Sequence, residues 1–223
     1  MSFIETLNTV LDEKHLLKHE FYQAWTCGEL TIDYLRIYAQ QYFHHVNAFP
    51  RYVSATHANC ESLEARQLLL ENLIDEEQGS ENHPELWLRF AEGIGETREN
   101  VKNANLLPET RHLIDTFLRL AKSSYAQGIG ALYAYERQIP SVADSKIAGL
   151  KKFYNIVSDE VLKFFTVHLI ADIHHANATR QLLNELSEED KEKAADAANE
   201  IANALWNFLT GVQSKINERK ALH

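Results

Sequence analysis

The stretch Phe164-Phe165-Thr166-Val167-His168-Leu169-Ile170-Ala171-Asp172-Ile173-His174-His175 is the most informative part of this sequence. At about 100° per residue in an α-helix, His168, Asp172 and His175 fall within roughly 60° of one another, whereas His174 points about 120° away. The rest of that helix face is mostly apolar, and it carries Val161, Phe164, Phe165, Thr179, Leu182, Leu183 and Leu186. Because unpaired polar groups are costly in apolar surroundings, the two imidazoles and the carboxylate need partners.

The composition is that of an ordinary globular protein. The chain has 223 residues, of which 45% are hydrophobic and 24% are charged. A net charge of -10 argues against nucleic acid or an anionic membrane as a partner, since both attract basic patches.

Several features predict a cytoplasmic location. Cys27 and Cys60 form no CxxC pair, which favours a reducing compartment. Glu5 and Asp12 stand where a secretory signal would be apolar, and no apolar run is long enough to span a membrane.

Helical periodicity runs through nearly the whole chain, which contains only 8 Gly and 4 Pro. The sequence predicts a single all-α domain over residues 1–223, a bundle of seven to nine helices. The first helix is expected from Phe3 to Trp25, and Pro50 is expected to kink or split the second long helix. Gly95 to Leu107 is expected to be a short connection.

The positions of His168, Asp172 and His175 suggest two metal ions rather than one. The two histidines lie about 10 Å apart along the helix axis, which suits a pair of ions roughly 3.5–4 Å apart. The remaining ligands should come from other helices whose apolar faces are interrupted in the same way.

Three such residues stand out elsewhere in the sequence. Glu136 shares a helix face with apolar residues, and so does Glu76, although Glu77 is an alternative by angle alone. His83 lies two turns beyond Glu76 if that helix continues past Gly79.

The candidate ligands are three carboxylates and three imidazoles. They are Glu76, His83, Glu136, His168, Asp172 and His175. A set without thiolate favours iron or manganese over structural zinc. The alternative is that these residues are core polar groups hydrogen-bonded to one another.

Several stretches together resemble one family. They are His19-Glu20-Phe21-Tyr22, Ala48-Phe49-Pro50-Arg51-Tyr52, Leu63-Glu64-Ala65-Arg66, Asp75-Glu76-Glu77, Tyr135-Glu136-Arg137-Gln138-Ile139-Pro140 and His168 through His175. These stretches are similar to those of the haem-oxygenase-like di-metal oxidases. Within that family they resemble the branch of the chlamydial protein associating with death domains and its bacterial relatives.

The resemblance implies a haem-oxygenase-like (TenA/PqqC-like) bundle without haem, in which the six residues above bind two metal ions. It implies an Fe/Fe or Fe/Mn pair, O₂ as co-substrate, and Glu76 rather than Glu77 as the ligand. It also implies synthesis of para-aminobenzoate for folate, with the ring cut oxidatively from the protein's own Tyr22 and the amino group taken from Lys146.

The residue pattern bears on Lys146 independently. Lys146 lies at the centre of an apolar stripe made by Val142, Gly149, Leu150 and Phe153. A lysine in that position either extends its amine to solvent or is held with a lowered pKa for chemistry. Tyr22 has no such pattern, and its assignment rests on the resemblance.

Three other functions remain open at this point. A di-metal oxygenase could act on a separate small molecule, and a non-enzymatic interaction module could bind a protein such as a death domain. A metal-free relative with the same fold would need Cys27 or Cys60 as a nucleophile. For the oxidase the expected partners are small molecules, namely O₂ and a reductant.

The last helix allows a homodimer. Its apolar stripe could serve the core or a second copy of the chain, and consists of Ile201, Leu205, Phe208, Leu209, Val212 and Ile216.

Overall fold

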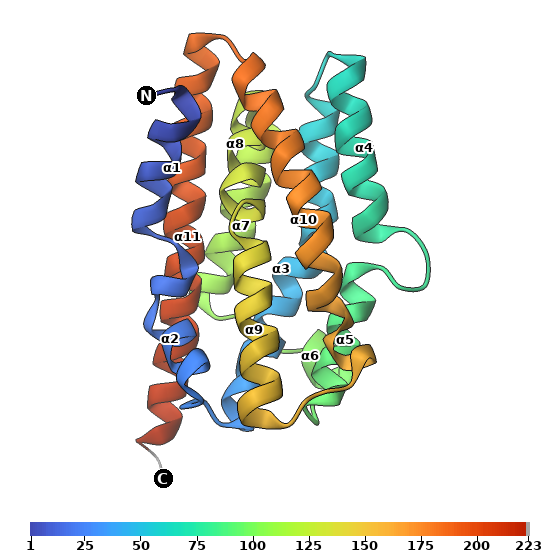
Figure 1. The fold of residues 1–223 in the computed structure, drawn as a ribbon, viewed down its shortest axis with the longest axis vertical. Coiled ribbons are helices and arrows are strands. Elements are labelled where there is room, and N and C mark those ends of the chain that lie inside the picture. The colour runs from blue at the N-terminus through green and yellow to red at the C-terminus, as the bar shows by residue number, and fades with distance from the viewer. Residues whose placement is uncertain (222–223) are drawn as a thin grey trace.

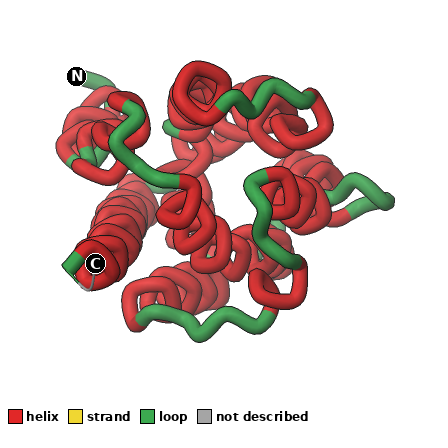
Figure 2. The backbone as a smooth tube through the Cα atoms, turned by 90° about the horizontal axis from the view of Figure 1, so that it is seen from below, coloured by secondary structure: helices red, strands yellow, loops and turns green. Residues whose placement is uncertain are grey.

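The computed structural model describes residues 1–221, except for the side chain of Ile170, and this part of the chain is all helix and loop (Figures 1 and 2). The predicted all-α class is therefore confirmed. The elements are α1 (Phe3–Glu13), η1 (Leu16–Lys18), α2 (Glu20–Cys27), α3 (Ile32–Ala58), α4 (Leu63–Glu77), α5 (His83–Gly93), α6 (Arg98–Lys102), α7 (Pro108–Ser123), α8 (Tyr125–Glu136), α9 (Ile139–Tyr154), α10 (Asp159–Glu185) and α11 (Glu188–Lys220).

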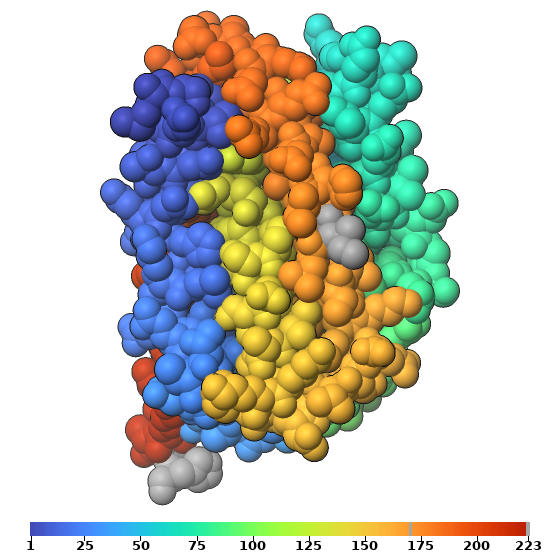
Figure 3. Space-filling model, viewed as in Figure 1, coloured from blue at the N-terminus to red at the C-terminus, as the bar shows by residue number. Residues whose placement is uncertain are grey.

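Helix α8 lies at the centre of the bundle, where it packs against α3, α7, α10 and α11. Helix α10 lies between α9 on one side and α4 and α5 on the other (Figure 1). In the space-filling view α1, α2, α9 and α10 form one face of the molecule, with α4 and α5 along its edge (Figure 3). Four helices that carry candidate ligands, α4, α5, α8 and α10, therefore surround one region of the interior.

The N-terminal segment is divided into three helical pieces where a single helix was expected. The side chains of His15 and His19 accept hydrogen bonds from Leu17 N and Phe21 N, so each imidazole caps the start of a new helical piece. In addition, the backbone N–H of Leu16 donates to Gln138 Oε1 at 2.9 Å, which ties the break to the α8–α9 junction. Helical periodicity does not reveal such contacts, because they depend on individual side chains and on the tertiary fold.

Two other boundaries also differ from expectation. Helix α3 continues through the buried Pro50 to Ala58 without splitting. The connection predicted from Gly95 to Leu107 contains the short helix α6, because Thr97 caps it and Val101 packs into the core. Together with the divided N-terminal segment, α6 explains why the described residues form more helical pieces than the expected seven to nine.

The apolar stripe of α11 packs within the same chain. Its six residues, from Ile201 to Ile216, are each at most 1% exposed. The stripe therefore needs no second copy to cover it. Among the described helices, none is both long and apolar enough to cross a membrane.

Helices α8 and α11 approach each other very closely at Gly130. A Cβ added at Gly130 would lie 2.1 Å from the backbone oxygen of Ala194 in α11. Because that neighbour is backbone rather than a flexible side chain, the two helices would have to move apart to accept it.

We therefore expect Gly130→Ala to lower the free energy of unfolding by about 1–3 kcal/mol, measured by denaturant titration. Helix propensity alone predicts the opposite result, a gain of about 1 kcal/mol. A Gly130→Ala protein more stable than wild type would contradict the close approach.

Candidate metal centre

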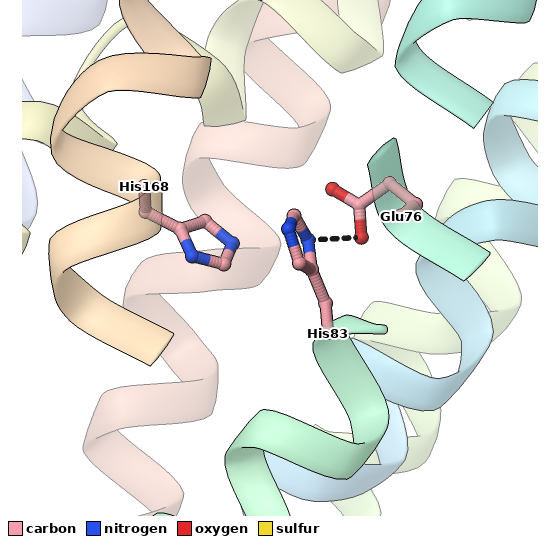
Figure 4. Close-up of side chains that lie close together, drawn as sticks. All are labelled: Glu76, His83 and His168. Carbon is pink, nitrogen blue, oxygen red and sulfur yellow. Dashed lines mark ion pairs between the residues drawn. The ribbon is translucent and has the colours of Figure 1, made fainter. Parts of the chain in front are cut away.

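Three of the six predicted ligands meet in the interior of the bundle. Glu76 at the end of α4, His83 at the start of α5 and His168 in α10 each offer a donor atom within 4.8 Å of the other two (Figure 4). All three residues are buried, with exposed fractions of 3%, 1% and 3%.

The break between α4 and α5 brings His83 to Glu76. Helix α4 ends at Glu77, and Gly79 adopts a positive φ of 80° in the loop that follows. Asn82 then caps α5 by accepting a hydrogen bond from Glu85 N. As a result the chain turns back, and Nδ1 of His83 lies 2.7 Å from Oε2 of Glu76. Glu77 is exposed.

His168 presents one defined nitrogen to this cluster. Its Nδ1 lies 2.6 Å from the backbone oxygen of Phe164, one turn earlier in α10. Because a carbonyl oxygen only accepts, Nδ1 carries the proton and Nε2 is left with a free lone pair. The ring faces that of His83, with 4.3 Å between the ring centroids.

The other three candidates are also buried, with exposed fractions of 0% for Glu136, 2% for Asp172 and 6% for His175. Glu136 accepts hydrogen bonds from Asn72 Nδ2 at 2.7 Å and from Thr179 Oγ1 at 3.3 Å. Nδ1 of His175 lies 3.7 Å from Oδ1 of Asp172, which is too long for a hydrogen bond.

Burial raises the pKa of Glu136 to about 8 and that of Asp172 to about 6. Burial also holds the pKa of His168 well below its usual value. For His83 and His175 burial acts in the same direction, but nearby carboxylates outweigh it and raise both pKa values, that of His175 to about 9. Each carboxylate would be stabilised in its charged form by a nearby cation.

Two buried polar atoms indicate where a cation would fit. Oδ2 of Asp172 and Nδ1 of His175 have no hydrogen-bond partner among the described residues. Among the described residues, Glu76 has the imidazole of His83 as its ion-pair partner, and Asp172 has that of His175. Three carboxylates and three imidazoles without lysine or arginine pairing are a donor set suited to iron or manganese.

A second buried group surrounds Lys146 of α9, which is only 3% exposed. Its amine donates a hydrogen bond of 2.8 Å to Tyr38 Oη, and the Tyr38 and Tyr22 hydroxyls are 2.9 Å apart. Five aromatic rings have their centroids 5.0–5.8 Å from the amine, and they belong to Tyr22, Tyr38, Tyr42, Trp87 and Phe165. Burial lowers the pKa of Lys146 to about 7.

An aromatic path leads from this lysine towards the carboxylates. Tyr38 stacks on Tyr42 with 5.3 Å between ring centroids, and the hydroxyl of Tyr42 lies 2.5 Å from that of Tyr135. Tyr135 immediately precedes Glu136 in α8. Buried contacts therefore run without a gap from Tyr22 and Lys146 to Tyr135, the residue next to the candidate ligand Glu136.

The sequence alone did not identify the polar residues that support the candidate ligands. Asn72 lies one turn before Glu76 on α4, and Asp75 reaches His175 with 3.1 Å between Oδ2 and Nε2. A polar residue four positions before a candidate ligand is the one signal that could have indicated Asn72.

Known proteins resemble this chain in sequence and in fold. A family model described as "Iron-containing redox enzyme" matches residues 36–207, which is more than half of the chain. A protein of Chlamydia pneumoniae named 4-aminobenzoate synthase is 42% identical over 211 residues, covering 94% of this chain and 94% of the relative. A 4-aminobenzoate synthase of Nitrosomonas europaea is 39% identical over 223 residues, covering 95% and 91%.

Among solved structures, a TenA homolog from Pseudomonas syringae superposes with a TM-score of 0.82. The match covers 96% of this chain and 93% of that chain, at 17% sequence identity. At this identity the similarity establishes the fold alone, and it confirms the haem-oxygenase-like bundle expected from the sequence.

The buried amine of Lys146 makes a testable contribution to stability. Its pKa is about 7 in the folded protein and about 10.4 for an ordinary lysine. The folded state therefore binds fewer protons between these values, so the free energy of unfolding rises with pH across that range. The cost of burying the charged amine is complete below about pH 7 and disappears towards pH 10.

At pH 6.5 we expect the free energy of unfolding of Lys146→Met to exceed that of wild type by about 1–3 kcal/mol. At pH 9 this gain should be smaller. Denaturant unfolding at the two pH values measures both. Lys151→Met removes an exposed lysine of the same helix and serves as the control. An equal effect of Lys146→Met at both pH values would show that the amine is not held in a lowered-pKa state.

Proposed function

The chain belongs to the family of iron-containing redox enzymes, and on that basis we propose that it makes 4-aminobenzoate (para-aminobenzoate) in an O₂-dependent oxidation. Relatives named for this activity are 39–42% identical over at least 94% of the chain. The predicted membership of an enzyme family is confirmed, which disfavours a purely non-enzymatic interaction module.

We propose that the six buried residues from α4, α5, α8 and α10 hold a pair of metal ions, Fe/Fe or Fe/Mn. The support is the convergence of Glu76, His83 and His168, together with the unpaired donor atoms of Asp172 and His175. When bound, such a pair would supply the O₂ activation needed to release the intact ring of Tyr22 oxidatively from the chain, with electrons for O₂ coming from a separate reductant.

The observation that carries the proposal is the hydrogen-bonded chain from Lys146 through Tyr38 to Tyr22. In the proposed reaction Tyr22 supplies the ring and Lys146 supplies the amino group, so the two must be held close together. A pKa near 7 leaves a large fraction of Lys146 as the neutral amine at neutral pH, which is the form that can react as a nucleophile.

The surrounding residues hold these two side chains and exclude water. Tyr22 is 2% exposed and Tyr38 is fully buried. Because the amine has an aromatic ring on several sides and one hydroxyl partner, its direction is fixed before any reaction begins. A dry site also protects a reactive intermediate from side reactions.

A second candidate function is favoured by one observation. A groove of about 580 Å³ runs over α10 and the α4–α5 loop, and its lining includes the candidate ligand His83. Such a groove could admit a separate small molecule to the metal centre, which would then be the substrate in place of Tyr22.

Product release from the purified protein tests the self-sacrificing reaction. Iron-loaded wild type given a chemical reductant and then exposed to O₂ should release 4-aminobenzoate, and the mass of the protein itself should fall. Tyr22→Phe should release little or none, because the ring donor has lost its hydroxyl. The control is Tyr34→Phe, which changes a partly exposed tyrosine of α3.

Mass spectrometry distinguishes the two candidate functions. A Tyr22→Phe protein that releases as much product as wild type, with no change in protein mass, would refute the self-sacrificing reaction. Oxidation of an added small molecule by the same protein would then favour the second candidate.

Metal content tests the ligand set. Anaerobically loaded wild type should hold about two metal ions per chain, and His168→Ala should lose at least one of them. His174→Ala is the matched control, since His174 lies in the same helix but is exposed. Equal metal content in all three proteins would show that His168 is not a ligand.

A further inference from the structure

An exposed carboxylate reaches a candidate ligand from outside the cluster. Asp75 immediately precedes Glu76 in α4, and its side chain is 54% exposed. Its Oδ2 lies 3.1 Å from Nε2 of His175 in α10, whose side chain is 7% exposed. This contact joins the outer edge of the candidate metal centre to the protein surface.

The direction of this hydrogen bond determines which atom of His175 faces inward. A carboxylate oxygen accepts, so Nε2 of His175 carries a proton and donates it to Asp75. The other nitrogen, Nδ1, is buried, lies 3.7 Å from Oδ1 of Asp172 and has no hydrogen-bond partner among the described residues. A cation bound at Nδ1 would therefore leave the outer hydrogen bond to Asp75 in place.

His168 is oriented by a different device. There the backbone oxygen of Phe164 accepts from Nδ1 and leaves Nε2 facing the cluster. His168 is thus oriented by its own helix, whereas the orientation of His175 depends on a side chain from another helix. A side-chain substitution can remove only the second of these two restraints.

Asp75 has no other evident task. Within the described part of the chain, its side chain makes no second hydrogen bond or ion pair besides the contact with His175. It lines the groove that also reaches His83. Because it is more than half exposed, its replacement leaves no cavity in the core.

We propose that Asp75 is a positioning residue that holds His175 with Nδ1 directed at the metal centre. The inference rests on the proposed function, because it takes His175 to be a ligand. It adds that the ligating atom is Nδ1 and that α4 contributes to the centre twice, through Glu76 from inside and through Asp75 from outside. Outer partners of this kind typically change metal affinity by about 10–100-fold.

Anaerobic titration with Fe(II) or Mn(II), in competition with a chelator of known affinity, measures the effect. Of the two bound ions, the one held less tightly should lose affinity by about 10–100-fold in Asp75→Ala. Asp75→Asn keeps an oxygen that can accept from Nε2, so its loss should be smaller than that of Asp75→Ala. Glu77→Ala, which removes an exposed carboxylate two residues away, should bind as wild type does.

Thermal unfolding of the metal-free proteins separates positioning from a structural role. We expect Asp75→Ala and wild type to unfold within about 2 °C of each other without metal, because substitutions at exposed positions usually change stability little. The two should differ only in how far added Mn(II) raises the midpoint. A similar loss of stability with and without metal would overturn the positioning role.

The remaining outcomes are also decisive. If Asp75→Ala binds both ions as tightly as wild type, the inference about Asp75 is wrong while the proposed ligand set stands. If Asp75→Asn loses as much affinity as His175→Ala, Asp75 binds the ion itself, which also overturns the positioning role. If wild type binds neither ion, the ligand set is wrong and the inference falls with it.

Discussion

The structure depends on enclosing three carboxylates and three imidazoles in the interior of an otherwise apolar bundle. Each acidic group is costly to bury in its charged form, and the high pKa values of Glu136 and Asp172 express that cost. Hydrogen bonds from Asn72 and Thr179 satisfy part of Glu136. Within the described part of the chain, the ion-pair partners of Glu76 and Asp172 are the imidazoles of His83 and His175, and a bound cation would offset the remaining cost of burying these carboxylates.

One helix connects this cluster with the buried lysine. Tyr38 and Tyr42 are four residues apart on α3, so both project from the same face of the helix. Tyr38 contacts Lys146 and Tyr42 contacts Tyr135, the neighbour of Glu136. Through these two residues, one turn apart, α3 contacts both the proposed amino donor and the tyrosine next to Glu136.

Helical periodicity was sufficient to predict the all-α class and the buried face of α10, where His168, Asp172 and His175 lie inside and His174 outside. It left Glu76 and Glu77 nearly equivalent, because the apolar stripe of α4 is too weak to show which of two positions about 100° apart faces the core. It also could not place His83, whose position depends on the turn at Gly79. The outer partner Asp75 was out of reach as well, since its contact joins residues 100 positions apart in the chain.

The burial of Tyr22 has a consequence for the lifetime of the molecule. Its ring packs against Phe21, Trp25 and Tyr38 at centroid distances of 5.4–6.4 Å. A chain that gives up this ring would keep a void of aromatic size and a Tyr38 hydroxyl with one partner fewer, a loss comparable to truncating a core aromatic residue, about 3–5 kcal/mol. A copy that has reacted would then unfold more often and be degraded faster by proteases. The supply of product would therefore follow the rate of protein synthesis.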